Sequence, residues 1–313
     1  MSSRVLIPAN PKLLRLAGLV LCVGVLIACS AMAWAQGYAN PHLLVEPAWL
    51  AEHLDDPNIR IVDVRGDALY LRGHIPGAVS LDGTQAINDP NSEIAGHLLG
   101  PEEFEKVIRG LGINDDTIVV VYDQSSSNAA ARLFYALEYY GHKDKVRILN
   151  GGLAAWTAEE RPLESGRRDV APGSFTARPN PELQADAEYV KAQIGKEGVV
   201  ILDVRSEGEY LGTDVRAAQG GHIPGATHLE WTVAVEDGSV QRFKPAEELW
   251  QIFGAAGVSP DAEIIPYCQT NVRASHTYFV LRLLGFEKIR PYEASWAEWG
   301  NRDDVPIVAG REI

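Results

Sequence analysis

Short apolar runs alternate with amphipathic segments along most of this sequence. The runs are rich in β-branched residues and apolar at nearly every position: Ile61–Arg65, Thr117–Asp123, Val146–Leu149, Ile201–Arg205, Glu263–Cys268 and Ile289–Tyr292. In the segments between them, apolar residues recur every three or four positions, which indicates helices with one buried face. Strands that are apolar on both faces are typical of a parallel sheet covered by helices. The pattern therefore predicts an α/β fold.

The pattern occurs twice along the chain. A Gly-His-Ile-Pro-Gly-Ala segment at Gly73–Ala78 is repeated at Gly221–Ala226, and an Asp-Val-Arg triplet, ending at Arg65 or Arg205, precedes each copy. A helical pattern, a second apolar run and another amphipathic helix follow each copy, so the repeat predicts two domains, each a small parallel sheet covered by helices on both faces. The predicted domains span residues 42–160 and 184–309, and a linker rich in Pro, Gly and charge joins them at 161–183.

Residues 1–35 have the pattern of a secretory signal. Three basic residues precede an uncharged apolar run that ends in Ala33-Trp34-Ala35: Arg4, Lys12 and Arg15. Small residues at such an end suit signal peptidase, so we expect cleavage after Ala35 and an exported, periplasmic protein. Two alternatives stay open. Leu26–Cys29 is similar to a bacterial lipobox, in which Cys29 is lipidated, and the apolar run is about long enough to remain as an anchor on the periplasmic face.

The charge of the chain limits its partners. The 313 residues carry a formal net charge of -14, which becomes -17 when the three basic residues of the predicted signal are removed. An acidic protein has no general attraction to nucleic acid or to an anionic membrane. We therefore expect no nucleic-acid partner, and membrane contact only through a lipidated Cys29 or a retained signal. An anionic substrate needs local positive groups to bind against the overall field.

Cys268 is the single cysteine after the predicted signal, which contains Cys22 and Cys29. An unpaired cysteine in an exported protein is an inert core residue, a partner in an intermolecular disulfide or a reactive thiol. Cys268 ends an apolar run, and a helical pattern begins near Arg273, so the loop between them lies at the carboxyl end of a strand. Loop N–H groups, the helix N-terminus and Arg273 all favour a thiolate there, which is the nucleophilic form. These features favour the reactive thiol.

The first domain serves as an internal comparison for this loop. Alignment of the second apolar runs places Asp123 opposite Cys268 and Asn128 opposite Arg273. The first domain thus lacks both the thiol and the arginine in the same loop. This fits one active and one inactive copy.

These motifs together resemble the tandem-domain rhodanese family, in its exported bacterial form. They are the Asp-Val-Arg and Gly-His-Ile-Pro-Gly-Ala pairs, the Tyr267-Cys268 loop and Tyr292–Trp299, and the match extends from about residue 42 to 308. The resemblance implies a silent N-terminal domain and a catalytic C-terminal domain in which Cys268 carries a persulfide. It also implies that a substrate-binding loop follows the cysteine: Gln269, Thr270, Asn271, Val272 and Arg273.

The family implies a sulfurtransferase without cofactor or metal. It would take a sulfane sulfur from a small-molecule donor, with thiosulfate the first choice, and pass it to cyanide or a thiol, including a thiol on a protein. The loop from Gln269 to Val272 has neither the Arg-Lys pair of many thiosulfate-using members nor the Gly-Ser-Gly of mercaptopyruvate-using members. Ala294 stands where the family usually has glycine. A 3-mercaptopyruvate-type enzyme and a sulfur or selenium carrier that turns over poorly alone remain alternatives.

The spacing from cysteine to arginine argues against a related chemistry. Phosphatases with a comparable loop place five residues between the cysteine and the arginine, so that the N–H groups surround a phosphate. Four residues separate Cys268 from Arg273, and Ala274 follows where those enzymes have Ser or Thr. The smaller ring suits a sulfur atom better than a tetrahedral oxyanion.

Some further polar residues have a structural alternative. Arg205 ends a strand at the same sheet edge and is a candidate to bind the anionic end of the donor. Its alternative is an ion pair with Glu207 or Glu209. His74 and His222 occur in both copies of the repeat, so we expect them to stabilise their turns.

Overall fold

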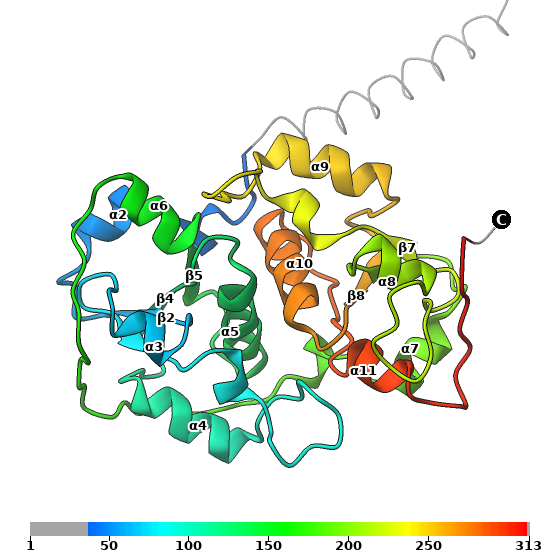
Figure 1. Ribbon diagram of the computed structural model, residues 1–313, viewed down its shortest axis with the longest axis horizontal. Coiled ribbons are helices and arrows are strands. Elements are labelled where there is room, and N and C mark those ends of the chain that lie inside the picture. The colour runs from blue at the N-terminus through cyan, green and yellow to red at the C-terminus, as the bar shows by residue number, and fades with distance from the viewer. Residues whose placement is uncertain (1–36, 312–313) are drawn as a thin grey trace, which may run out of the picture. The chain divides into compact units, whose positions relative to one another are not determined.

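The computed structural model describes residues 37–311 (Figure 1). From Tyr38 onward the chain forms one compact unit. The predicted signal, its cleavage after Ala35 and the lipobox at Cys29 lie outside the described residues. Within residues 37–311, no helix is long and apolar enough to cross a membrane. We call residues 38–160 the first half and residues 184–311 the second half.

The first half contains a five-stranded parallel sheet with the strand order β1-β5-β4-β2-β3. The strands are β1 (Leu44–Val45), β2 (Ile59–Asp63), β3 (Val79–Ser80), β4 (Ile118–Tyr122) and β5 (Val146–Leu149). The helices are α2 (Pro47–Glu52), α3 (Asp67–Tyr70), α4 (Pro101–Gly110), α5 (Asn128–Tyr139) and α6 (Gly152–Ala158), with 3-10 segments η1 (Pro41–Leu43) and η2 (Thr84–Ile87). Successive strand residues point to opposite faces. Ile61 and Val120 pack with α2, α3 and α6 on one face, and Val62 and Val121 pack with α4 and α5 on the other.

The second half repeats this plan around a three-stranded parallel sheet with the order β7-β6-β8. The strands are β6 (Val199–Asp203), β7 (Thr227–His228) and β8 (Glu263–Tyr267). The helices are α7 (Ala187–Gln193), α8 (Glu207–Leu211), α9 (Ala246–Ala255), α10 (Val272–Leu283) and α11 (Ser295–Trp299), with the 3-10 segment η4 (Trp231–Ala234). A further 3-10 segment, η3 (Pro181–Leu183), directly precedes this half. Ile201 and Ile265 pack with α7 and α11, whereas Leu202 and Ile264 pack with α9 and α10. Both halves thus confirm the predicted α/β fold.

The prediction of a strand at Ile289–Tyr292 is wrong, because no regular strand forms there. This segment forms isolated parallel bridges to its neighbours. Pro266 is the fourth residue of β8, where the first half has Val121 in β4. Proline has no N–H to donate, so the ladder toward this segment is interrupted at that point. The Tyr292 N–H still donates to the Pro266 carbonyl at 3.0 Å, which keeps the segment in place beside the sheet.

The two strand-to-helix loops differ in length. The loop Asp123–Ser127 has five residues, and the loop Cys268–Asn271 has four. Counted back from the helices, Asn128 therefore corresponds to Val272. The predicted pairing of Asn128 with Arg273 is wrong by one position, because the first loop contains an extra residue.

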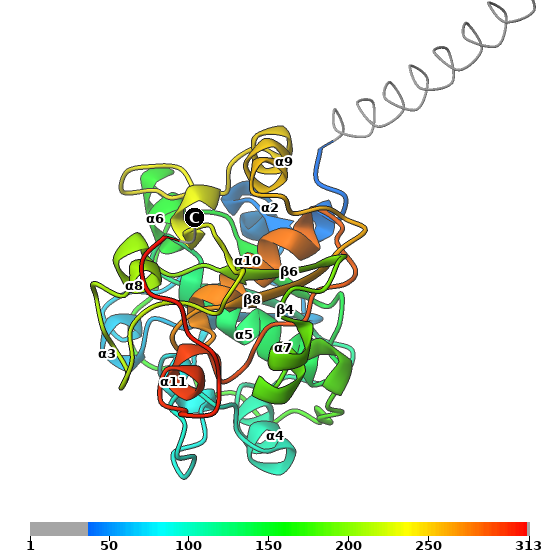
Figure 2. The ribbon, with the colours of Figure 1, turned by 90° about the vertical axis from the view of Figure 1, so that its right-hand side faces the viewer.

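The two halves meet along α5 and α10, which lie side by side (Figures 1 and 2). The Phe134 ring meets the Phe279 ring edge-on, with centroids 4.9 Å apart. Tyr135 and Tyr278 meet in the same way at 5.3 Å. One hydrophobic cluster includes residues from both halves. Burial of shared apolar surface therefore fixes the position of the first half against the Cys268-bearing half.

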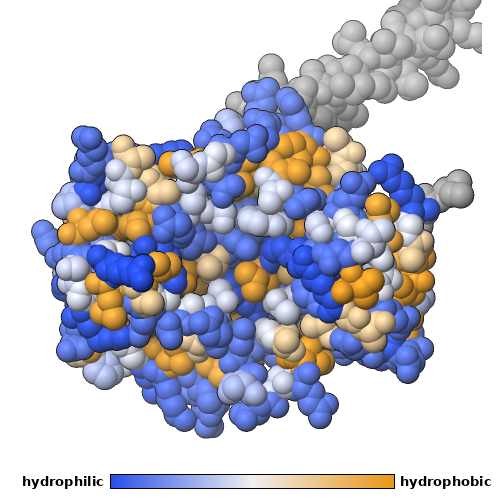
Figure 3. Space-filling model, in the orientation of Figure 1, coloured by the Kyte–Doolittle hydropathy of each residue, from blue (hydrophilic) through white to orange (hydrophobic). Residues whose placement is uncertain are grey.

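On the face shown in Figure 3, hydrophobic residues form small separate groups among hydrophilic ones. Among the described residues, the large hydrophobic side chains that are exposed are Leu69, Leu71, Leu163 and Val215. Exposed apolar residues of this kind are normal for a folded protein.

Candidate active site

Cys268 lies at the carboxyl end of β8, in the loop Cys268–Asn271, which we call the Cys268 loop. The cysteine is unpaired and 1% exposed. The start of α11 holds it from one side. The Cys268 N–H donates to Ser295 Oγ at 3.2 Å, and the Trp296 N–H donates to the Cys268 carbonyl at 3.0 Å. The thiol is therefore fixed at the sheet edge where open α/β folds bind ligands.

Ser295 supports Cys268 from a strained backbone position. Its φ is 51°, in the left-handed region that a side chain disfavours. Its Oγ donates to the Tyr292 carbonyl at 2.8 Å while accepting the Cys268 N–H. Ala294, which stands where the family usually has glycine, has a φ of -72°. Alanine therefore fits at position 294, since the unusual conformation lies one residue later.

Asn271 ends the Cys268 loop in a left-handed conformation, with φ at 59°. Asparagine tolerates this region better than most residues. Its Nδ2 donates to Glu293 Oε2, and its carbonyl accepts the N–H of Ser275 at 3.0 Å and the hydroxyl at 2.6 Å. Val272 follows as the first residue of α10. Asn271 thus sets the angle at which the loop enters the helix.

Arg273 forms a two-point ion pair with Glu209 at the end of the Cys268 loop. Nη1 donates to Oε2 at 2.6 Å and Nη2 donates to Oε1 at 2.8 Å. Burial works against the charged guanidinium, but the hydrogen bonds to Glu209 and the electrostatic attraction of Cys268 and Glu209 raise the pKa of Arg273 above its ordinary value. Arg273 therefore supplies positive charge near the thiol while its two Nη groups are held by protein.

The middle of the Cys268 loop contacts other parts of the chain. Gln269 Nε2 donates to the Arg216 carbonyl at 3.2 Å. Thr270 packs against Gly96 of the first half. A Cβ on Gly96 would lie 2.7 Å from the Thr270 Cβ and 2.9 Å from its carbonyl oxygen, so this approach needs glycine. The first half thus forms part of the cover over the site.

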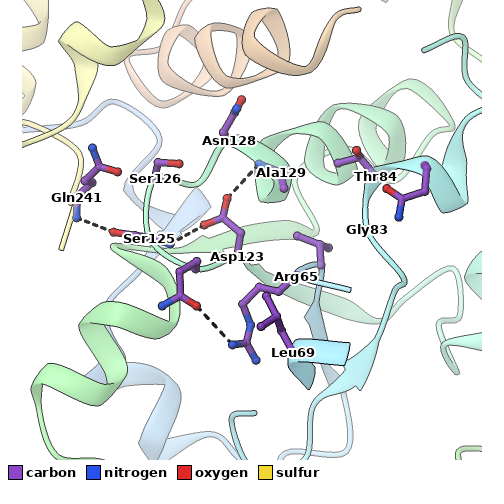
Figure 4. A pocket seen from close by; sticks show the side chains of 13 residues that line it. Arg65, Leu69, Gly83, Thr84, Asp123, Ser125, Ser126, Asn128, Ala129 and Gln241 are labelled. Atoms are coloured by element: carbon purple, nitrogen blue, oxygen red, sulfur yellow. Dashed lines mark hydrogen bonds between the residues drawn. The ribbon is translucent and has the colours of Figure 1, made fainter. Parts of the chain in front are cut away.

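The corresponding loop of the first half, Asp123–Ser127, shows what this backbone geometry binds. The Asp123 carboxylate accepts backbone N–H groups from Ser125, Ser127 and Ala129, each at 3.0 Å. Figure 4 shows the bonds from Ser125 and Ala129. Burial raises the pKa of Asp123, and these hydrogen bonds act in the opposite direction. The loop therefore directs its N–H groups at the side chain of the residue that follows the strand, where they stabilise negative charge.

A cavity of about 550 Å³ opens beside this first-half loop (Figure 4). Most of the residues that line it are of polar type, among them Arg65, Thr84, Gln124 and, from the second half, Gln241. No cysteine lines it. The cavity therefore lies in the first half, whereas the cysteine lies in the second half. The candidate nucleophile predicted from the sequence, Cys268, lies in the other loop, Cys268–Asn271.

Arg205 makes its contacts within the protein. Its Nε and Nη2 donate to Asp203, with Nη2–Oδ2 at 2.6 Å, and Nη2 also donates to the Gly221 carbonyl at 2.6 Å. The predicted alternative, an ion pair with a nearby carboxylate, is present, but the carboxylate is Asp203, the last residue of β6, and not Glu207 or Glu209. Arg65 forms the same pair with Asp63 in the first half. Donor binding by Arg205 stays a prediction, and this geometry favours its structural alternative.

The histidines near the two loops are occupied by packing. The His74 ring stacks on Tyr70 at 3.8 Å, and the His222 ring stacks on Tyr210 at 3.7 Å. Both histidines are buried in their turns, as expected for a stabilising role. On α10, burial lowers the pKa of His276 to about 3, so its imidazole is neutral and a poor base at neutral pH. Within the described residues, no group of three or more His, Cys, Asp or Glu residues is arranged to hold a metal.

Comparison with known proteins accounts for this duplicated arrangement. The model of the rhodanese-like domain matches twice, at residues 46–159 and 186–302. The chain belongs to the rhodanese family. This rhodanese is 40% identical to the sulfur carrier protein TtuD of Thermus thermophilus over 292 residues, covering 88% of this chain and all of that protein. It is 37% identical to a thiosulfate sulfurtransferase of Azotobacter vinelandii over 275 residues, covering 86% and 98% of the two chains.

A solved relative has the same two-domain fold. The crystal structure of the 3-mercaptopyruvate sulfurtransferase SseA of Escherichia coli matches this rhodanese with a TM-score of 0.73 at 35% identity. The match covers 82% of this chain and 99% of that one. The family prediction made from the repeated motifs is therefore confirmed.

Sequence reasoning missed the residues of this rhodanese that reach the Cys268 loop from elsewhere. They are Gly96, Glu209, Glu293 and Ser295. The sequence contains one signal for Glu209: Ser206 and Glu209 have capping-box spacing, and the structure shows that box at the start of α8. No local pattern indicates that Glu209 also pairs with Arg273, because the two residues are far apart in sequence.

Proposed function

We propose that this protein is a sulfurtransferase that moves a sulfane sulfur from thiosulfate to a thiophilic acceptor through a persulfide on Cys268. The observation that carries the proposal is the N–H cradle of the Asp123 loop. In the second half, Cys268 takes the same place directly after its strand, in a loop one residue shorter that also enters its helix through a left-handed residue. The sulfurtransferase class predicted from the sequence is confirmed by the relatives, which include thiosulfate and 3-mercaptopyruvate sulfurtransferases.

The reaction is a double displacement. The Cys268 thiolate attacks the outer sulfur of thiosulfate, the S–S bond of the donor breaks, and sulfite leaves with the bonding electron pair. Cys268 then carries a persulfide anion. Loop N–H groups and the nearby charge of Arg273 stabilise that anion. Cyanide or an acceptor thiolate attacks the outer sulfur, and the Cys268 thiolate leaves unchanged, so the protein undergoes no net oxidation.

The donor and the acceptor are separate parts of the proposal. Glu209 balances part of the charge of the Arg273 guanidinium and occupies its two Nη groups. Arg273 is therefore better suited to attract the donor electrostatically than to hydrogen-bond to it directly. 3-Mercaptopyruvate is the second candidate donor, since a relative is named for it. A protein thiol is a further acceptor, supported by a relative named as a sulfur carrier. In that role the persulfide would form and persist until the partner arrives.

The test is the intact mass of the protein lacking residues 1–35 after incubation with thiosulfate. We expect a gain of one sulfur atom, about 32 Da, reversed by cyanide with release of thiocyanate and absent from the Cys268→Ser variant. A gain with 3-mercaptopyruvate alone would reassign the donor. A stable gain with slow cyanide turnover would identify a carrier. No gain with any sulfane donor would overturn the proposal.

The export of the protein is a second proposal, supported by the charge and apolar pattern of residues 1–35. N-terminal analysis of the protein from a bacterial host distinguishes the three forms. Cleavage gives a chain beginning at Gln36, lipidation gives a modified Cys29, and an anchor keeps the whole segment. A full-length, unmodified chain in the cytoplasm would contradict export.

A further inference from the structure

We propose that Arg132, which belongs to the first half, is a positioning residue for the Cys268 loop in the second half. It acts through Glu293, Asn271 and the segment 88–99, which we call the cover segment. This inference rests on the proposed function, since it concerns how that reaction site is held. It gives the half without a thiol a specific part in catalysis, beyond packing.

The Arg132 guanidinium is buried where the two halves meet. Arg132 lies on α5 and is 0% exposed. Nη2 donates to Glu293 Oε1 at 2.7 Å, and Nη1 donates to Glu293 Oε2 at 3.2 Å. Nη2 also donates to the Gly96 carbonyl at 2.6 Å. One side chain thus joins α5, the cover segment and the segment before α11.

Glu293 distributes this contact to the Cys268 loop. Its carboxylate is buried, and each oxygen accepts two hydrogen bonds. Oε1 accepts from Arg132 and from the Leu98 N–H at 3.2 Å, and Oε2 accepts from Arg132 and from Asn271 Nδ2. A buried carboxylate in this position needs its cation, because an unpaired charge is expensive away from water. Without Arg132, Glu293 would have to move or take up a proton, and its bond to Asn271 would change.

Two routes lead from Glu293 to the thiol. The first runs through Asn271, which has a left-handed backbone and lies three residues after Cys268. Its side chain makes no helix cap and bonds to Glu293 instead. The second runs along the chain through Ser295, which accepts the Cys268 N–H. Both ends of the Cys268 loop are therefore linked to the Arg132–Glu293 ion pair.

The same guanidinium also fixes the cover. Gly96 accepts a hydrogen bond from Arg132 and packs against Thr270 in the middle of the Cys268 loop. Loss of Arg132 would free the cover segment at the point where it approaches Thr270. Water would then reach the buried ends of the loop, Cys268 and Asn271, and the N–H groups would lose their fixed direction.

The chain offers a matched control for this ion pair. Arg282 on α10 pairs with Glu138 on α5, with Nε–Oε2 at 3.0 Å and Nη2–Oε1 at 3.1 Å. This pair also crosses between the halves and is largely buried. Arg282 lies nine residues along α10 from Arg273, away from the Cys268 loop. Removing it should weaken the contact between the halves without changing the loop.

The experiment compares two double variants, Arg132→Met with Glu293→Gln, and Arg282→Met with Glu138→Gln. Each removes both charges of a pair, so neither leaves a buried charge unpaired. Urea unfolding, kcat and KM for thiosulfate and cyanide, and the single-turnover rate of persulfide formation are measured for both. We expect similar losses of stability. We expect kcat and the persulfide rate to fall about 10- to 100-fold in the first variant and less than about threefold in the second, because misdirected loop groups cost rate.

Single variants provide conservative controls and a fallback if a double variant does not fold. Arg132→Lys keeps the charge but loses the two-point contact, so its rate of persulfide formation should lie between those of the double variant and the wild type. Arg282→Lys should form the persulfide at the wild-type rate. Suppose that every Arg132 variant that folds forms the persulfide as fast as the matching Arg282 variant. The positioning role of Arg132 is then wrong, and the proposed function stands. If the wild-type protein itself takes up no sulfur, the proposed function fails first.

Discussion

Arg273 and Glu209 face each other across the mouth of the Cys268 loop, with both Nη groups bonded to the two carboxylate oxygens at 2.6 and 2.8 Å. The sequence marks Arg273 as a free cation for the donor. In the structure it also ties α10 to α8. The charge remains close to the thiol, since Arg273 interacts electrostatically with Cys268.

This pair makes the stability depend on pH in a defined window. Burial alone would raise the pKa of Glu209, but the hydrogen bond and charge of Arg273, with Ser206, lower it to about 2. A lowered carboxyl pKa stabilises the fold above the ordinary value of 4.5, and that stabilisation is lost as the pH falls toward 2. We expect Glu209→Gln to cost about 3 kcal/mol near neutral pH, at 1.36 kcal/mol per pKa unit, and progressively less below pH 4.5.

Denaturant unfolding across this pH range measures the difference between the wild type and Glu209→Gln. Glu207→Gln is the matched control, because Glu207 pairs with Arg311 at the surface, where both side chains are exposed. Its effect should be small at every pH. A Glu209→Gln effect that stays constant down to pH 2 would contradict the assigned cause.

The duplicated Asp-Val-Arg triplet allows the two arginines to be compared. Arg205→Met and Arg65→Met each leave a buried aspartate unpaired, so each should lower the free energy of unfolding by about 3–5 kcal/mol. If both arginines are structural, as their contacts indicate, KM for thiosulfate measured on the folded fraction will match the wild type in both. A KM raised tenfold or more in Arg205→Met alone would establish donor binding by Arg205.

We expect Asp123 to contribute to the free energy of unfolding and to have little effect on turnover. Asp123→Ala leaves the N–H groups of Ser125, Ser127 and Ala129 without their acceptor. We expect a loss of about 2–3 kcal/mol in the free energy of unfolding, the cost of unsatisfied buried donors. Turnover should stay within about twofold of the wild type, because the Cys268 loop is untouched. A much larger fall in kcat without loss of structure would give the first-half loop a catalytic part.

The cover segment can be tested with a pair of glycines in nearly the same backbone conformation. Gly96 has a φ of +91° and lies against Thr270, whereas Gly166 has a φ of +87° with nothing within 4 Å of a built Cβ. Alanine at either site adds a similar backbone strain of roughly 1–2 kcal/mol. At position 96 it also pushes the cover segment off the Cys268 loop. We expect Gly96→Ala to lose about tenfold in kcat, and Gly166→Ala to keep it.

Equal activity in the two alanine variants would show that the contact between Gly96 and Thr270 is unimportant for transfer. Circular dichroism and the unfolding midpoint of both variants provide the control for folding. The persulfide rate then separates an effect on the first step from one on acceptor access.

Local patterns were sufficient for most of the fold. The apolar runs placed β2, β4, β6 and β8 to within two residues, because a strand buried on both faces needs an unbroken apolar sequence. The strand predicted at Ile289–Tyr292 does not form because of a residue in the neighbouring strand β8. Pro266 has no backbone N–H to donate to this segment. The one-residue slip at Asn128 arose because loop length, unlike strand position, leaves no periodic signal.

The sequence by itself determined the two-copy architecture, the place of Cys268 at a strand end and the absence of a thiol from the first copy. These depend on repeat, periodicity and composition, which are properties of neighbouring residues. Only the tertiary structure decided that Arg273 pairs with Glu209, that Gly96 covers Thr270 and that Arg132 reaches Asn271 through Glu293. Such partners are selected by burial, since a charge away from water pairs with whichever opposite charge the packing brings to it, however distant in sequence.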